Sequence, residues 1–304
     1  MKKLNITFTS IILTALGCFA FLPQMQAVVP APDGCYPNFT TAEGCKALNS
    51  LTSGAANTAI GWYSLFANAN GSNNTAVGAG ALDLNTADNN TAVGVAALLL
   101  NTTGINNTAN GTGALVFNNT ADENTVTGAF AMYSNTEGDF NTANGAFALY
   151  FNTIGERNTA IGDSALYLNT EGSRNTAVGN PALLNNTTGN DNTAIGTFAL
   201  RSNIDGERNT AVGAGALFSN TADSNTGIGT DALSDNTTGF GNVAIGAQAL
   251  FSNTEGFENV AIGTAALGAN TTGVGNVVLG FMPATTLPRP VTLSVSAPTP
   301  QVRT

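Results

Sequence analysis

From residue 57 onward, short apolar runs alternate with Gly and Asn in a pattern that repeats about every 17 residues. Most repeats begin Asn-Thr-Ala, continue with Val or Ile and a Gly, and then reach an Ala-Leu pair and a second Asn. A Gly or a paired Asn every few residues disfavours a helix. Short apolar runs between such residues are typical of strands joined by tight turns. The pattern therefore predicts an all-β chain built from small equivalent coils.

The repeat reads N-T-A-(V/I)-G-x-x-A-L-x-x-N-T-x-G-x-x, and we number its positions from one to seventeen. Position five is Gly in all fourteen copies, and position twelve is Asn in all thirteen complete copies. Eleven of the thirteen intervals between first Asn residues are 17 residues long, whereas those that begin at Asn74 and Asn209 are 16. The structural repeat residues in an early, a middle and a late copy are Asn57, Gly61, Leu65, Asn68, Asn158, Gly162, Leu166, Asn169, Asn242, Gly246, Leu250 and Asn253.

A coil of this length has room for two short strands and two tight turns. When coils stack, each strand pairs with its copy in the next coil at about 4.8 Å. A degenerate copy at residues 40–56 precedes the regular ones, as expected for an end coil with a single neighbour. The sequence therefore predicts a β-solenoid, or β-roll, of about 15 coils over residues 40–280.

Alternation along a strand predicts which side chains face the core. We expect positions two and four to point inward, because position four is mostly Val or Ile, and Leu at position nine to point inward from the second strand. Position three then points outward, where its uniform Ala indicates a close neighbour such as another subunit. Asn110, Thr127 and Asn144 occupy position four in three consecutive copies. They are interpreted as a hydrogen-bonded polar ladder inside the rod, and a polar cavity or ion site there is the alternative.

The Asn and Gly positions predict the turns. Asn at positions one and twelve is expected there, with its amide bonded to the local backbone and to the Asn of the next coil. Gly at position five is expected in a backbone conformation that other residues avoid.

The segments Asn-Val-Ala-Ile-Gly at 242–246 and 259–263 resemble the head repeat of YadA-type trimeric autotransporter adhesins. The resemblance covers residues 40–280. It implies stacked left-handed β-rolls, a homotrimer, and adhesion to a host or matrix surface. The repeat is also similar to a group of uncharacterised bacterial secreted repeat proteins.

The two ends of the chain differ from the repeats. Residues 1–27 predict a secretory signal peptide, with an apolar stretch that is shorter than a membrane span. A lipoprotein signal with lipidated Cys18 is the alternative. Residues 28–39 then lead into the repeats, and residues 281–304 form a Pro/Thr-rich tail whose prolines block further strand pairing. We expect a bacterial protein that is secreted or held at the cell surface, with no membrane span after signal cleavage.

Two cysteines remain in the mature chain, Cys35 and Cys45. In an exported protein they are candidates for one disulfide, and two free thiols are the alternative.

Composition narrows the chemistry. A chain with no His cannot use Ser-His-Asp or Cys-His catalysis or build a His-ligated zinc site. Its net charge of −10 argues against nucleic acid as a partner. Carboxylates near the turns are interpreted as solvated charge rather than a weak calcium site, and we expect no metal and no cofactor. These carboxylates are Glu137, Glu171, Asp205 and Glu255.

Aromatic residues recur at positions seven, ten and eleven. They form either a stripe that binds a partner or a glycan, or packing between subunits or in the roll interior. The residues are Phe130, Tyr133, Phe147, Tyr150, Phe151, Tyr167, Phe198, Phe218 and Phe251.

The functional prediction is an exported, non-enzymatic repeat protein, either adhesin-like or a structural rod. The alternatives are a solenoid that binds polysaccharide or ice, and a purely structural spacer or tail-fibre-like protein. Ice binding requires a long outward array of Thr, and the inward placement predicted for position two argues against it.

Overall fold

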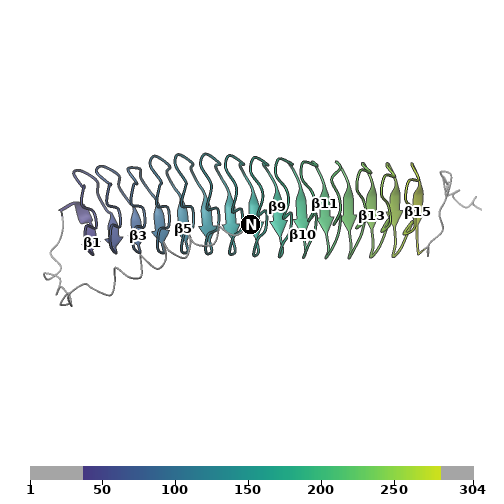
Figure 1. Ribbon diagram of the computed structural model, residues 1–304, viewed down its shortest axis with the longest axis horizontal. Coiled ribbons are helices and arrows are strands. Elements are labelled where there is room, and N and C mark those ends of the chain that lie inside the picture. The colour runs from purple at the N-terminus through teal and green to yellow at the C-terminus, as the bar shows by residue number, and fades with distance from the viewer. Residues whose placement is uncertain (1–36, 282–304) are drawn as a thin grey trace, which may run out of the picture. The chain divides into compact units, whose positions relative to one another are not determined.

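Residues 37–281 form a parallel β-solenoid in the computed structural model, which describes this part of the chain (Figure 1). A short 3-10 helix, η2 (Pro37–Phe39), precedes fifteen strands of three residues each. The strands lie in one sheet in chain order, and each pairs in parallel with the next. The all-β solenoid with a 17-residue period is therefore confirmed.

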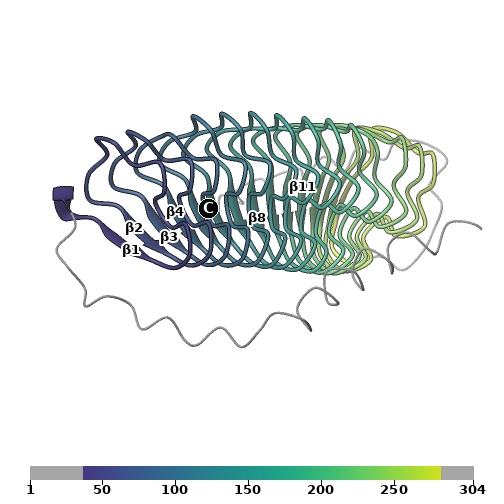
Figure 2. The same ribbon diagram turned by 60° about the vertical axis from the view of Figure 1, so that its left-hand side comes forward.

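The strands recur at the start of each coil. They are β1 (Thr41–Glu43), β2 (Thr58–Ile60), β3 (Thr75–Val77), β4 (Thr91–Val93), β5 (Thr108–Asn110), β6 (Thr125–Thr127), β7 (Thr142–Asn144), β8 (Thr159–Ile161), β9 (Thr176–Val178), β10 (Thr193–Ile195), β11 (Thr210–Val212), β12 (Thr226–Ile228), β13 (Val243–Ile245), β14 (Val260–Ile262) and β15 (Val277–Leu279). Equivalent positions pair throughout, as where Ala160 lies opposite Ala177. Figure 2 shows the successive strands along one side of the coils, with turn segments closing the other side.

Each described coil contains one strand, and the prediction of a second strand was wrong. The opposite limb carries Ala and Leu at positions eight and nine, and both are buried. Two adjacent inward residues are incompatible with strand alternation. The limb turns both inward by placing the Leu at a positive φ, as in Leu166 at φ 53°. Its backbone still bonds the next coil, because the Leu166 N–H donates to the Ala182 carbonyl oxygen at 3.0 Å.

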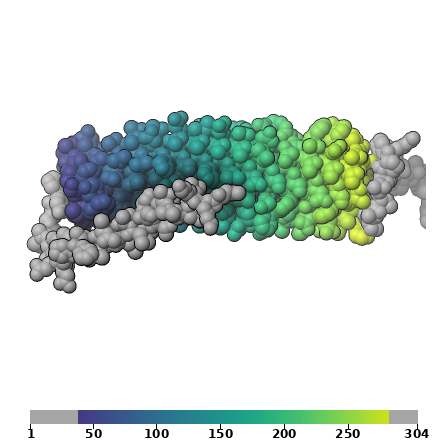
Figure 3. Space-filling view, viewed as in Figure 1, coloured from purple at the N-terminus to yellow at the C-terminus, as the bar shows by residue number. Residues whose placement is uncertain are grey.

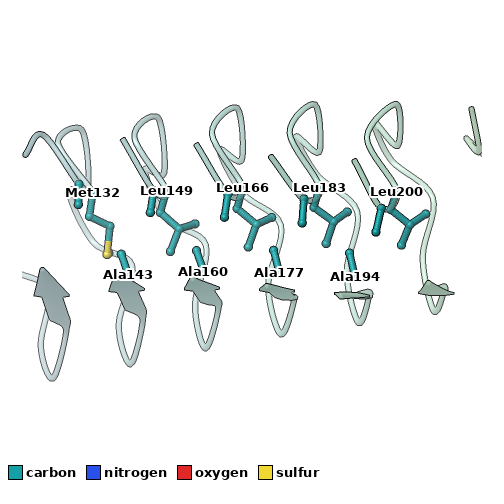
Figure 4. Close-up of a cluster of buried hydrophobic side chains, with 14 of the residues drawn as sticks. Met132, Ala143, Leu149, Ala160, Leu166, Ala177, Leu183, Ala194 and Leu200 are labelled. Carbon is teal, nitrogen blue, oxygen red and sulfur yellow. The ribbon is translucent and has the colours of Figure 1, made fainter. Parts of the chain in front are cut away.

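The predicted faces of the strand were also wrong. Ala160 at position three is fully buried, whereas Ile161 at position four is 41% exposed. The core is narrow, since the strand Ala faces the Ala-Leu pair of the opposite limb directly (Figure 4). Uniform Ala at position three therefore reflects a thin core rather than a contact with another subunit.

One coil shows how tightly the core volume is matched. Among the complete coils in the described stretch, Val occupies position three only at Val126, and Met occupies position nine only at Met132 in the same coil. An unbranched Met can adapt its shape to the larger Val opposite. In the space-filling view of Figure 3, successive coils follow one another in chain order and their side chains leave no gap between them.

Gly at position five is required for two reasons. Gly162 has φ +131°, a conformation that L side chains rarely adopt. A Cβ added there would also lie 2.6 Å from the carbonyl oxygen of Gly179 in the next coil. Gly61 and Gly246 have the same geometry, with φ of +134° and +131°.

Candidate functional site

The most regular surface of the solenoid is the outward side of its sheet. We call it the outer sheet face, meaning the side chains at positions two and four of strands β2–β15. Position two is Thr in eleven strands and Val in the last three, and position four is Val, Ile, Leu, Asn or Thr. The face therefore carries no charged and no aromatic side chain over fourteen consecutive strands.

Exposure differs between the two ladders of this face. Ile60, Ile161 and Ile195 at position four are 40–41% exposed, and most Thr at position two are partly buried. Thr108, Thr125 and Thr142 are more open, and their strands are those with Asn or Thr at position four. Asn110, Thr127 and Asn144 are exposed on the outer sheet face, so the predicted polar ladder inside the rod was wrong.

Two rows of buried Asn lie behind this face and fix its spacing. Oδ1 of each position-one Asn accepts from the backbone N–H of the next position-one Asn, from Asn57 through to Asn276. Within one coil, Nδ2 of Asn158 and Nδ2 of Asn169 both donate to the Gly172 carbonyl oxygen at 2.8 Å. Each coil is thereby closed on itself and linked to its neighbour.

The predicted structural repeat residues have consistent environments. The Asn residues Asn57, Asn68, Asn158, Asn169, Asn242 and Asn253 and the Leu residues Leu65, Leu166 and Leu250 are all fully buried. These residues build the coil and present nothing to solvent.

The position-twelve Asn ladder is interrupted at the two short coils. In regular coils Nδ2 of this Asn also donates to Oδ1 of the preceding one, as from Asn203 to Asn186 at 2.8 Å. In the 16-residue coil, Asn220 donates to the Ala222 carbonyl oxygen, and Asn203 Oδ1 is buried without a partner. An open hollow of about 660 Å³ lies beside this coil, lined in part by Asp205 and Asp223.

Aromatic side chains form stacks along coils 124–174, outside the buried core. Tyr133 and Tyr150 stack at 5.3 Å between centroids, and Tyr150 and Tyr167 at 5.4 Å. Phe130 and Phe147 stack in the same way at 5.8 Å. Burial raises the pKa of the Tyr150 hydroxyl, and the flanking Tyr133 and Tyr167 raise it further. None of these five rings belongs to the buried core, so packing in the roll interior is excluded for them.

Because stacked rings cover one another's faces, these aromatics offer mainly edges to a partner. The sugar-binding use of an aromatic side chain needs an open ring face. Within the stacks this face is available only at the ends, which weakens the glycan interpretation of the stripe.

The predicted turn carboxylates Glu137, Glu171, Asp205 and Glu255 are all exposed. Other carboxylates near the turns pair with neighbouring Arg side chains on the surface. Arg174 Nε donates to Asp191 Oδ1 at 2.6 Å, and Arg157 Nη1 to Glu156 at 2.9 Å. The hydrogen bond from Arg174 holds the pKa of Asp191 below its ordinary value. Over residues 37–281, no group of three or more acidic or Cys side chains is placed to hold a metal ion.

Several predicted features lie outside the described residues. These are the signal segment, Cys18, Cys35 and the Pro/Thr-rich tail beyond residue 281. Cys45 is exposed, and the Cys35–Cys45 disulfide stays a prediction because Cys35 lies outside the described residues.

Sequence reasoning missed the outward Thr ladder. A signal was present, because positions two and four lack charge in all fourteen regular copies while charges gather at positions fourteen, sixteen and seventeen. In a thin solenoid the smallest and most constant position faces the core, and here that position is three.

No protein-family model matches the sequence, and a search of characterised proteins found no similar chain. The helical segments within residues 37–281 include none with the length and hydropathy to cross a bilayer.

Proposed function

We propose that this chain is an exported, non-enzymatic, adhesin-like rod that attaches to an extended surface through its outer sheet face. The observation that carries the proposal is a charge-free face repeated over fourteen strands of a chain whose other outward positions include charges. Exposed apolar surface of this extent is typical of interaction sites. A structural spacer has no requirement for such uniformity on one face.

The experiment introduces charge on the face and on a matched site elsewhere. Ile161→Glu with Ile195→Glu places two carboxylates on the outer sheet face. Leu168→Glu with Ile204→Glu does the same at other exposed apolar positions of the same coils, where Leu168 is 36% and Ile204 51% exposed. The mature protein is incubated with collagen matrix, crystalline cellulose, chitin and ice, and the retained fraction is measured.

We expect at least one surface to retain the wild-type protein and the Leu168/Ile204 variant, and to lose the Ile161/Ile195 variant. Retention on no surface, or equal loss in both variants, overturns the proposal.

A homotrimer, as in the adhesins whose head repeat this sequence resembles, is the second candidate use of the face. The exposed Ile and Val of position four could be covered by two further copies of the chain. Light scattering distinguishes the two uses. A wild-type trimer that Ile161→Glu with Ile195→Glu converts to a monomer assigns the face to subunit contact, and a wild-type monomer removes this alternative.

A further inference from the structure

We infer that the surface bound by the outer sheet face is ice, and that the binding segment is the Thr-x-(Val/Ile) array of strands β8–β12. This inference rests on the proposed function and names the partner of that same face. Its observations are the free hydroxyls, the spacing, the rigidity and the neutrality of the array.

Two Thr ladders run along the solenoid, and they differ in their hydrogen bonding. At position thirteen the hydroxyl donates to a backbone carbonyl of the next coil, as from Thr170 to Thr187 at 3.2 Å and from Thr187 to Ile204 at 3.1 Å. At position two, none of the eleven Thr hydroxyls of strands β2–β12 bonds to another protein group. The outer sheet face therefore offers a row of hydroxyls whose hydrogen bonds are left for an external partner.

The array is periodic in two directions. In-register parallel pairing places equivalent Thr side chains about 4.8 Å apart along the axis. Positions two and four of one strand lie about 6.6 Å apart across the sheet. A fixed lattice of hydroxyl and methyl groups at these spacings, which are close to oxygen spacings in hexagonal ice, can hold water in ice-like positions.

The array is also held rigid from behind. The backbone N–H groups of Asn175 and Asn192 donate at 3.0 Å to the position-one Asn of the preceding coil. These residues directly precede Thr176 and Thr193, so the buried ladder fixes the strand spacing. A rigid surface binds a crystal lattice with higher affinity than a flexible one, because less conformational entropy is lost on binding.

The chemistry of the face favours ice over the other occupants. A dry contact with a second copy would bury the free hydroxyls, which costs free energy unless each finds a new partner. The chain also carries a net charge of −10, so two copies repel one another. A polysaccharide surface is matched by open aromatic ring faces, and the outer sheet face has no aromatic side chain. A neutral water lattice satisfies the hydroxyls and accommodates the methyl groups between them.

The test is thermal hysteresis, together with partitioning of the mature protein into slowly growing ice. Thr176→Lys with Thr193→Lys disrupts the centre of the array. Thr188→Lys with Thr238→Lys is the matched control, because both Thr residues are exposed on turns away from the sheet. Circular dichroism melts confirm that both variants fold.

We expect hysteresis and ice partitioning in the wild-type protein and in the Thr188/Thr238 variant, and loss of both in the Thr176/Thr193 variant. Absence of hysteresis and partitioning in the wild-type protein overturns the ice inference. The proposed function survives that result if another surface retains the protein in a way that depends on Ile161 and Ile195. Equal loss of hysteresis in both Lys variants overturns the assignment to β8–β12.

Discussion

The carboxamide oxygen of Asn158 accepts a hydrogen bond from the backbone N–H of Asn175, one coil further along, at 3.0 Å. The amide nitrogen of the same Asn158 donates to the Gly172 carbonyl oxygen of its own coil at 2.8 Å. One buried side chain thus closes a coil and joins it to the next. Repetition of this arrangement sets the strand spacing on which the outer sheet face depends.

Asn158→Asp tests this arrangement with a side chain of the same shape. The Asp loses the donor to Gly172 and places a carboxylate in a fully buried site, so we expect a loss of about 3 kcal/mol near neutral pH. The loss should be smaller near pH 3, because a protonated carboxyl can donate again. Thermal melts at both pH values measure it, with Asn180→Asp at an exposed turn as the control. Equal melting temperatures for Asn158→Asp and the wild-type protein would contradict the structural role of the amide.

The short coil predicts a stabilising insertion. The 17-residue coil at 107–123 has the same Thr-Ala-Asp ending with one extra residue, and there Asn118 Nδ2 donates both to Ala121 and to Asn101 Oδ1. One Thr inserted after Asn220 should restore this pattern and give Asn203 Oδ1 its missing donor. We expect a gain of about 1 kcal/mol, seen as a higher melting temperature.

The same Thr insertion after Asn169 lengthens a regular coil and serves as the control for that experiment. It should lower the melting temperature, since Asn152 Oδ1 beside this coil already accepts a hydrogen bond from Asn169 Nδ2. If the insertion after Asn220 is as unfavourable as the control, the short coil is not a defect in the ladder.

Asp83 gives the solenoid a pH dependence. Burial raises the pKa of its carboxyl, and its Oδ1 is buried with no hydrogen-bond partner in the described structure. The folded chain therefore binds this proton more tightly than the unfolded chain. The stabilising contribution is complete below the ordinary pKa of 3.8 and is lost as pH rises through the raised value.

Asp83→Leu should consequently raise the melting temperature more at pH 7 than at pH 3. The neighbouring coils hold Phe66 and Leu99 at this position, so burial of a Leu adds on the order of 1 kcal/mol at either pH. Ser234→Leu, at the same position of another coil, provides the comparison and should show equal shifts at both pH values. A pH-independent shift for Asp83→Leu would show that ionisation of this carboxyl does not affect stability.

The sequence predicted the coil but not its cross-section. The repeat length and the regular placement of Gly and Asn were sufficient to predict the solenoid. Invariant residues such as Gly162 and Asn158 are compatible with few other folds for a 17-residue unit. The assignment of faces was wrong because it placed the most hydrophobic position, as in Ile161, in the core. In a coil this thin, volume excludes Ile where Ala160 lies, and the branched residue remains outside.

The second limb was equally beyond prediction from alternation. Its two inward residues, such as Ala165 and Leu166, require a left-handed backbone at a non-glycine residue. Stacking of identical coils stabilises that conformation, and no local sequence preference indicates it.

The outward placement of position two is the central claim, and thiol accessibility measures it most directly. In the predicted mature chain, which begins after residue 27, Cys35 and Cys45 are changed to Ser and single Cys residues replace Thr159, Ala160 and Ile161 in turn. The account predicts rapid labelling by a water-soluble maleimide at 159 and 161 in the native protein, and labelling at 160 only after unfolding. Fast labelling at 160 with protection at 159 and 161 would contradict it, because the two faces of the strand would then be reversed.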